Sequence, residues 1–302
     1  MLQTLHIAKV ATFSGHKDCI YVLEKETNGT FFSAGSDGFV VRWNLSKPEE
    51  GELIAQVANS VYAMHHLPQE NHLLVGQNHE GVYKIDLANN AIIQSAKITT
   101  SQIFDIKSSD KYILVGTGDG LLVLLSRQDL SVVSKIKLSE KSIRCIAINP
   151  LHGTYAVGCS DFSVQIFSFA SNRLLHKLDG HKNSVFSVAY SPDGKYLLST
   201  GRDAAIKIWD TDHYQLHQTI PAHLFAVNNI LFSENGKYFA TASMDKTIKL
   251  WNADSFRLLK VIDKARHASH TTSVNKLLWL GNELASASDD KKIFLWQIEG
   301  LL

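Results

Sequence analysis

Short apolar runs separated by turn residues follow one another along almost the whole chain. The clearest unit spans residues 223–262, where runs rich in β-branched and aromatic residues occupy 227–232, 238–243, 247–251 and 256–262. The segments between them carry Ser, Asn, Gly and Asp, which favour tight turns. No part of the unit has an extended helical period, so the pattern predicts four short strands.

The same unit recurs at a nearly constant interval. Its third run ends on a tryptophan in four of the copies, and Trp209 and Trp251 are 42 residues apart. Stepping along the chain by about this period finds seven equivalent positions, at residues 43, 85, 125, 167, 209, 251 and 296. A period of about 40–45 residues with four strands in each repeat is typical of the blades of a β-propeller. The chain is therefore predicted to be all-β, with seven four-stranded antiparallel blades in one domain spanning residues 1–302.

Each of the four tryptophans lies six residues after an aspartate, and a histidine opens the same unit. Together with Gly15-His16, Gly180-His181 and Trp209-Asp210, this pattern resembles the WD40 repeat family, which has a Gly-His and a Trp-Asp signature. The resemblance extends over essentially the whole chain. It implies a seven-bladed propeller in which one His, one Ser or Thr, one Asp and one Trp of a blade form a hydrogen-bonded tetrad. Carried over by spacing, the tetrads are His16/Ser33/Asp37/Trp43, His181/Ser199/Asp203/Trp209, His223/Thr241/Asp245/Trp251 and His270/Ser286/Asp290/Trp296.

A set of Ser, His and Asp is also the composition of a hydrolase triad. A hydrolase needs one such set, whereas this chain carries four sets at the same position in its repeats. A carboxylate can accept from a histidine N–H, a hydroxyl can bridge, and an indole N–H can donate, so each set can satisfy itself when buried. We expect the tetrads to stabilise the blades, and no residue of the chain to be catalytic.

Three units in the middle of the chain lack the tetrad. Apolar residues replace the hydroxyl and the indole together, as Val75 and Ile85, Val115 and Leu125, and Val157 and Phe167. Paired replacement avoids leaving a buried polar group without a partner. We therefore expect blades two to four to be held by packing alone and to exchange their backbone hydrogens faster than the other blades.

The two ends of the sequence are expected to close the ring. Only six residues follow Trp296, too few for a fourth strand, whereas residues 5–13 precede the first histidine with a strand-like composition. Phe13 stands three residues before His16, as Ile220 stands before His223. Residues 5–13 are thus predicted to complete the last blade as its outer strand, which hides two strand edges that could aggregate.

The composition narrows the class of protein. The chain has 45% hydrophobic and 20% charged residues and a formal net charge of +1, so no chain-wide field attracts nucleic acid or an anionic membrane. No apolar run approaches the roughly 20 residues of a membrane-spanning helix, and residues 1–4 do not resemble a secretory signal. The three cysteines have no metal-ligand spacing. A cytoplasmic protein is expected, monomeric and without a cofactor or a small-molecule substrate.

Binding residues are expected around the mouth of the central channel, on the face where proteins of the WD40 family most often bind partners. By its distance from the histidine, the second residue of each innermost strand should point there. These residues are Tyr21, Tyr62, Phe104, Arg144, Phe186, Asn228 and Asn275. Four aromatic residues and an arginine are typical of an interaction hot spot; side chains that simply plug the channel are the alternative.

Further residues are expected on the same face. Arg202, Met244 and Asp289 each precede a blade aspartate, so they should rim the channel mouth. The connection 263–269 is long and basic, and it is expected to overhang this face beside Asn275. Both features would add to a surface for a protein partner.

The sequence favours a non-catalytic scaffold that binds other proteins or peptide segments. One alternative is a specialised adaptor or a membrane-recruited propeller. Against it, the arginine that some ligase adaptors carry two residues after Trp-Asp is absent, and no Arg-Arg pair resembles the motif of phosphoinositide-binding propellers. Another alternative is an enzyme with an active site in the channel, but neither the histidines at 65, 66, 72 and 79 nor the glycine-rich run 116–120 has the spacing of a metal site or a phosphate loop. Neither nucleic acid nor a membrane is expected as a partner.

Overall fold

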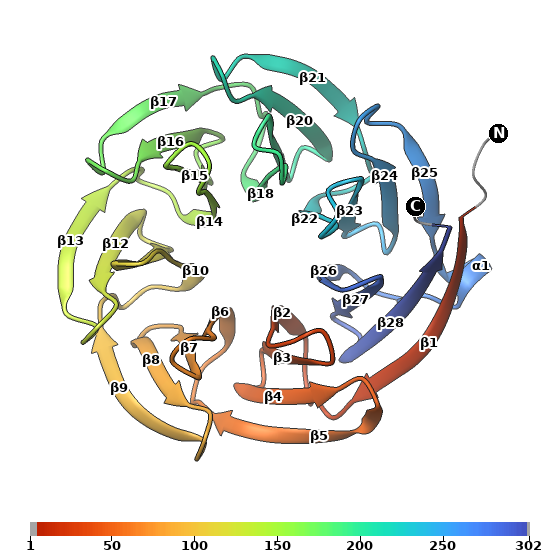
Figure 1. Cartoon of the computed structure of the whole chain (residues 1–302), viewed down its shortest axis with the longest axis horizontal. Coiled ribbons are helices and arrows are strands. Elements are labelled where there is room, and N and C mark those ends of the chain that lie inside the picture. Colours follow the sequence, from red (N-terminus) through yellow and green to blue (C-terminus); the bar gives the residue numbers. More distant parts are fainter. Residues whose placement is uncertain (1–4, 301–302) are drawn as a thin grey trace.

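Strand pairing arranges the chain as a ring of seven sheets (Figure 1). The structure is a computed structural model that describes residues 5–300; residues 1–4, where no secretory signal is expected, and 301–302 lie outside the described part. Each sheet has four antiparallel strands, with the innermost strand beside the central channel and the outermost strand on the perimeter. The predicted all-β, seven-bladed fold is therefore confirmed.

Six blades follow the chain from the innermost strand outward. Blades one to three are formed by β2 (Ile20–Lys25), β3 (Thr30–Gly35), β4 (Phe39–Asn44) and β5 (Lys47–Gln56); by β6 (Val61–Leu67), β7 (His72–Gln77), β8 (Gly81–Asp86) and β9 (Ala91–Lys97); and by β10 (Ile103–Ser108), β11 (Tyr112–Thr117), β12 (Leu121–Ser126) and β13 (Val132–Lys137). Blades four to six are formed by β14 (Ile143–Asn149), β15 (Thr154–Cys159), β16 (Val164–Ser168) and β17 (Leu174–Leu178); by β18 (Val185–Tyr190), β19 (Tyr196–Gly201), β20 (Ala205–Asp210) and β21 (Leu216–Pro221); and by β22 (Val227–Phe232), β23 (Tyr238–Ser243), β24 (Ile248–Asn252) and β25 (Leu258–Ile262).

Blade seven takes its strands from both ends of the sequence. It combines β26 (Val274–Leu280), β27 (Glu283–Ser288) and β28 (Lys292–Glu299) with β1 (His6–Ser14). The connection from blade six to blade seven contains the short helix α1 (Lys264–His267). No helix among residues 5–300 is long and apolar enough to cross a lipid bilayer.

The core lies between neighbouring blades. The second and third strands of each blade are buried on both faces; all six residues of β15 are buried, for example. Each apolar cluster combines two blades, as where Val22 and Phe32 of blade one pack with Met64 and Leu73 of blade two. Full burial of one such side chain stabilises the fold by about 1.5–3 kcal/mol. Stacking of the blades therefore holds the ring in shape.

The strand β1 closes the ring. It pairs antiparallel with β28, from His6 opposite Glu299 to Ser14 opposite Lys292. The predicted role of the N-terminal segment as the outer strand of the last blade is thus confirmed.

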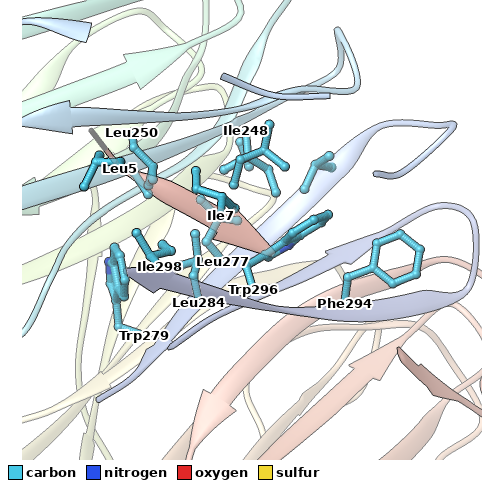
Figure 2. Packing of buried hydrophobic residues seen from close by; sticks show 14 residues of the cluster. Leu5, Ile7, Ile248, Leu250, Leu277, Trp279, Leu284, Phe294, Trp296 and Ile298 are labelled. Carbon is cyan, nitrogen blue, oxygen red and sulfur yellow. The ribbon is translucent and has the colours of Figure 1, made fainter. Parts of the chain in front are cut away.

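The buried residues at the two ends of β1 contact different blades. Leu5 and Ile7 belong to the apolar cluster between blades six and seven, which also contains Leu250 and Trp296 (Figure 2). At the other end, the fully buried Phe13 packs in the core shared with blade one. Closure therefore depends on apolar burial on both sides of blade seven as well as on backbone pairing.

Candidate functional site at the channel mouth

A β-bulge sets one residue of every innermost strand apart from the regular pairing. In β2, Ile20 pairs with Gly35 and Val22 pairs with Ala34, which leaves Tyr21 without a partner in the second strand. The same shift occurs at Tyr62, Phe104, Arg144, Phe186, Asn228 and Asn275. A bulge redirects the side chain of the extra residue. We call these seven residues the mouth ring; all of them line one cavity of about 760 Å³ in the central channel.

Five members of the mouth ring form a continuous arc of stacked groups. The ring centroids of Tyr21 and Tyr62 are 4.7 Å apart, and those of Tyr62 and Phe104 are 5.5 Å apart. The guanidinium carbon of Arg144 lies 3.9 Å from the centroid of Phe104 and 4.9 Å from that of Phe186. Aromatic pairs and a cation over an aromatic face each contribute about 0.5–1.5 kcal/mol. The arc, Tyr21 to Phe186, is thus a preformed apolar surface with one positive charge.

Arg144 is the member of this arc whose polar groups are free to bind a ligand. Its side chain contacts two aromatic faces but has no hydrogen-bond or ion-pair partner among residues 5–300. Burial lowers the pKa of Arg144, yet a guanidinium remains charged at any physiological pH. Its N–H groups are therefore available to an acceptor that enters the cavity.

The two asparagines of the mouth ring serve the protein itself. Asn228 Nδ2 donates to Ser273 Oγ and to the Val274 carbonyl, both at 2.9 Å. Asn275 Nδ2 donates to the Ile20 carbonyl at 2.9 Å and to Asp289 Oδ1 at 2.7 Å. These bonds brace blades six, seven and one. The structure therefore brings all seven predicted residues together but leaves only the aromatic and cationic arc free for a partner.

Below the mouth ring the channel has a charged wall that sequence reasoning missed. His65 Nδ1 lies 3.1 Å from Glu24 Oε1, and Lys107 Nζ lies 3.3 Å from Asp105 Oδ1. Both carboxylates also bridge blades, because Glu24 accepts from the backbone N–H of the second blade at 3.0 Å and Asp105 accepts from that of the fourth at 2.7 Å. Lys276 forms no ion pair within the described residues, and burial together with the nearby Lys107 lowers its pKa. The carboxylates are occupied as structural acceptors.

The members of each tetrad lie within hydrogen-bond distance of one another. In blade one, His16 Nδ1 lies 3.0 Å from Asp37 Oδ2 and His16 Nε2 lies 2.7 Å from Ser33 Oγ, which also accepts from Trp43 Nε1 at 2.7 Å. The same three contacts occur in the tetrads His181/Ser199/Asp203/Trp209, His223/Thr241/Asp245/Trp251 and His270/Ser286/Asp290/Trp296. Each tetrad histidine thus contacts the aspartate through Nδ1 and the buried hydroxyl through Nε2.

Burial and hydrogen bonding set the protonation of the tetrads. Burial lowers the pKa of His16 and of His223 despite the neighbouring aspartates. Burial raises the pKa of Asp203, but the hydrogen bond and the charge of His181 and the backbone N–H groups outweigh it, so the pKa is held below its ordinary value. We assign neutral rings in His16 and His223, with Nδ1–H donating to the aspartate and Nε2 accepting from the hydroxyl. The hydroxyls of Ser33 and Thr241 are also fully buried, so they face only the other members of their tetrads.

The tetrad of blade six differs from the predicted set of four, because a second hydroxyl joins it. Thr241 is fully buried, and its Oγ1 lies 2.8 Å from His223 Nε2 and accepts from Trp251 Nε1 at 2.9 Å. The additional member is Thr247, whose Oγ1 lies 3.2 Å from His223 Nδ1 and donates to Asp245 Oδ1 at 2.6 Å. The prediction named only Thr241 as the hydroxyl of this blade. With no exposed surface, Thr241 is closed to any partner and acts only within the blade.

The tetrad of blade seven also differs from the predicted set, through a backbone group. Ser286 is fully buried, and its Oγ lies 2.8 Å from His270 Nε2 and accepts from Trp296 Nε1 at 2.8 Å. The carbonyl oxygen of Ser286 lies 3.2 Å from the same His270 Nε2. This contact was not predicted, since the spacing of side chains carries no information about a backbone acceptor. Both oxygens of Ser286 thus lie near His270 Nε2. Like Thr241, Ser286 is fully buried and cannot contact a partner.

The expectation that blades two to four are held by packing alone is wrong. The ammonium of Lys84 in blade two is buried and donates to the Arg127 carbonyl of blade three at 2.9 Å. Glu70 of blade two pairs in turn with the Arg127 side chain. Hydrogen bonds also replace the tetrad locally in blade three, where Asp119 accepts from Thr99 and Thr117. Faster hydrogen exchange in these blades stays a prediction.

The predicted rim residues differ in what they offer. Met244 is 52% exposed and Arg202 is exposed, whereas Asp289 is engaged by Asn275. Beside Met244 lie two exposed apolar residues that were not predicted, Leu224 and Phe225. Their signal is present in the sequence, because the residues that follow the tetrad histidine are polar in the other three blades with a tetrad.

The basic connection 263–269 was expected to overhang the face of the channel mouth beside Asn275, but it lies away from the channel (Figure 1). Its helix α1 lies at the outer edge of the ring (Figure 1), and Lys9 of β1 donates to the Ala268 carbonyl at 2.8 Å. The side chain of Asp263 caps α1 by accepting from the Arg266 backbone N–H at 2.8 Å. Such a cap stabilises the start of the helix.

Comparison with known proteins identifies the repeat. The WD40 model, described as WD domain, G-beta repeat, matches residues 8–44, 172–210, 214–252 and 263–297, which make up about half of the chain. Each of these segments contains one tetrad. Most of blades two to four, which lack it, lies between the first two segments.

Several known proteins are similar to the chain over part of their length. The Periodic tryptophan protein 2 homolog of Mus musculus is 24% identical over 66% of the chain, and the Striatin homolog of Dictyostelium discoideum is 22% identical over 68%. A Probable cytosolic iron-sulfur protein assembly protein 1, from Eremothecium gossypii, is 26% identical over 39% of the chain. The matched regions cover 24%, 29% and 38% of these relatives, so the chain corresponds to well under half of each.

Proposed function

Because the chain belongs to the WD40-repeat family of β-propellers, we propose that it is a non-catalytic scaffold that binds a protein or a peptide segment at the mouth ring. The observation that carries the proposal is the arc from Tyr21 to Phe186, which places four aromatic rings and one arginine without a polar partner around a single cavity. Rigid aromatic area and a forked donor are the groups that dominate binding energy at protein interfaces.

The geometry favours binding over catalysis. The tetrad hydroxyls are capped, and the channel carboxylates Glu24 and Asp105 already accept from neighbouring blades. A general base needs a free acceptor within reach of a substrate proton. We infer a monomeric cytoplasmic protein whose partners are other proteins, rather than nucleic acid, a membrane or a small-molecule substrate.

An affinity pull-down tests the proposal. The wild-type chain is compared with the variant Tyr62→Ala/Phe104→Ala/Arg144→Ala and with a control. The control Ile92→Ala/Ile93→Ala/Val133→Ala removes exposed apolar residues from the outer strands of blades two and three. Both variants must keep the wild-type melting temperature. Partners that are lost only with the mouth-ring variant support the proposal. Retention of every partner by that variant would refute binding at the mouth ring.

A further inference from the structure

Blade six presents a second surface, made of residues that do not line the channel cavity. Leu224 and Phe225, in the connection that enters the blade, are 85% and 63% exposed, and Met244, in the turn between β23 and β24, is 52% exposed. The Met244 backbone N–H donates to the Ala226 carbonyl at 2.9 Å, so the connection and the turn lie side by side. We call Leu224, Phe225 and Met244 the blade-six patch. Exposed large apolar groups that gather in one place mark interaction sites more often than scattered ones do.

Comparison with blade five shows that the fold does not require apolar residues here. The Leu224 N–H donates to the tetrad Asp245 at 3.1 Å, as the Lys182 N–H donates to Asp203 at 3.0 Å. Met244 likewise corresponds to Arg202, whose N–H donates to the Ser184 carbonyl at 2.9 Å. The same backbone positions therefore carry a lysine and an arginine in blade five. Packing gives no reason for leucine and methionine in blade six.

The backbone beneath the patch is rigidly held. Ser243 Oγ lies 2.9 Å from the Ala226 carbonyl and 3.2 Å from the Phe225 carbonyl, and it donates to one of the two. The tetrad aspartate fixes the other end of the connection through the Leu224 N–H. A preformed surface loses little conformational entropy when a partner binds.

Cations lie beside the patch, because the His223 N–H donates to the Ala204 carbonyl at 3.1 Å and so brings the connection into blade six alongside the blade-five turn that carries Arg202. The exposed side chains of Lys182, Arg202 and Lys246 form no ion pair within the described part of the chain. The tetrad aspartates of the two turns, Asp203 and Asp245, are occupied by the tetrad histidines, and Asp263 is paired with Arg266. An apolar patch with unpaired cations at its border is complementary to an apolar side chain flanked by carboxylates.

We propose that the blade-six patch and its three cations bind an acidic segment of a partner protein that carries large apolar side chains. The apolar side chains cover Leu224, Phe225 and Met244, while Asp or Glu residues of the segment pair with Lys182, Arg202 and Lys246. This inference rests on the proposed function, since it names the chemistry of one partner segment, but it uses residues other than the mouth ring.

Selection from a library of random peptides displayed on phage, with the whole chain as bait, tests the proposal. The expected binders combine Asp or Glu with large apolar residues. A synthetic peptide of the selected sequence should lose about tenfold or more in affinity for the variant Leu224→Thr/Phe225→Thr/Met244→Ser. This variant copies the polar residues of blades seven and one, so it is expected to fold. The control Leu174→Thr/Leu175→Thr, at exposed leucines of β17, should bind as the wild type does.

A second variant separates charge from apolar contact. Lys182→Gln/Arg202→Gln/Lys246→Gln should weaken binding and remove most of its dependence on salt between about 50 and about 500 mM NaCl. Selection of basic or neutral peptides, no enrichment, or equal binding to the blade-six variant overturns the inference. So does binding only to single-stranded nucleic acid or to anionic vesicles. Loss of binding in the Tyr62/Phe104/Arg144 variant but not in the blade-six variant would leave the proposed function standing and refute this inference alone.

Discussion

Arg127 Nε of blade three donates to Glu70 Oε1 of blade two at 2.6 Å. The same carboxylate lies 3.2 Å from His72 Nδ1 and 3.8 Å from the buried ammonium of Lys84. Burial raises the pKa of Glu70, but the hydrogen bonds from Arg127 and His72 and the nearby charges outweigh it and hold the pKa below its ordinary value. Two blades without a tetrad are thus joined by a network in which one carboxylate serves three cationic or hydrogen-bonding groups.

Replacement of this carboxylate should destabilise the ring. In Glu70→Gln the Arg127 and Lys84 charges lose their counterion, and we expect the free energy of unfolding to fall by about 1–3 kcal/mol. Urea denaturation followed by tryptophan fluorescence measures the change. The matched control is Glu140→Gln, where the side chain is 91% exposed beside Lys137 and the expected change is below about 0.5 kcal/mol. Equal effects of the two substitutions would show that the network contributes nothing.

Glu24 should make the free energy of unfolding depend on pH. Burial raises its pKa, but the hydrogen bond and charge of His65, the charge of Lys107 and the His66 N–H lower it to about 2. Because the folded-state pKa lies below the ordinary 4.5, this stabilisation is complete above about pH 4.5 and is lost as pH falls toward about 2. The stability difference between the wild type and Glu24→Gln should therefore shrink as pH falls through this window.

Denaturation curves at several pH values, over the part of the window in which the chain is folded, measure that difference. Glu49→Gln, at an exposed residue of β5, is the control and should give a difference that does not vary with pH. A constant difference between the wild type and Glu24→Gln would contradict the assigned pairing.

The tetrads should behave as coupled units. Ser199→Ala leaves the Trp209 N–H without an acceptor and the His181 ring without its hydroxyl partner, so we expect a loss of about 2–4 kcal/mol. The double variant Ser199→Val/Trp209→Phe copies Val157 and Phe167 of blade four and removes both polar groups together. A double-mutant cycle should show that it costs less than the sum of its single substitutions. Strict additivity would mean that the hydroxyl and the indole do not depend on each other.

Ring closure should be sensitive to one side chain of β1. Phe13 is fully buried, with its ring centroid 5.2 Å from Phe31 and 5.6 Å from Trp43 of blade one. We expect Phe13→Ala to cost about 3–5 kcal/mol, because the cavity would open between the last blade and the first. Val10→Ala, at a residue of the same strand that is 46% exposed, is the control. A variant without residues 1–13 should unfold at a lower temperature, and an unchanged melting temperature would refute the role of the closing strand.

The fold was predictable because its signals are local and repeated. The spacing from Asp203 to Trp209 recurs in four units, and the apolar substitutes Ile85, Leu125 and Phe167 keep the same phase, so the third strand of every blade could be found. The length left after Trp296 and the strand-like start then led to the closure. The mouth ring followed by counting from the histidine in four blades and from the repeat period in the other three.

The charged contacts were not predictable in the same way. Arg127 and Glu70 are far apart in the sequence, and their contact depends on which side chains neighbouring blades turn toward each other. The same is true of Asn275, whose amide reaches the Ile20 carbonyl across the closure of the ring. A repeat pattern gives the place of a residue within its blade but not its partner in the next blade. The Leu224-Phe225 pair, in contrast, departs from the other tetrad blades and could have been noticed.

The bulge in each innermost strand separates recognition from architecture. Tyr21, Arg144 and Asn228 differ in size and charge, yet they occupy the same backbone arrangement. Each is the bulged residue of its strand and is left out of the pairing with the second strand. Codon changes at the five positions of the arc can therefore rewrite what the channel accepts while the wall behind it stays as it is. Specificity and folding can be inherited, and redesigned, independently of each other.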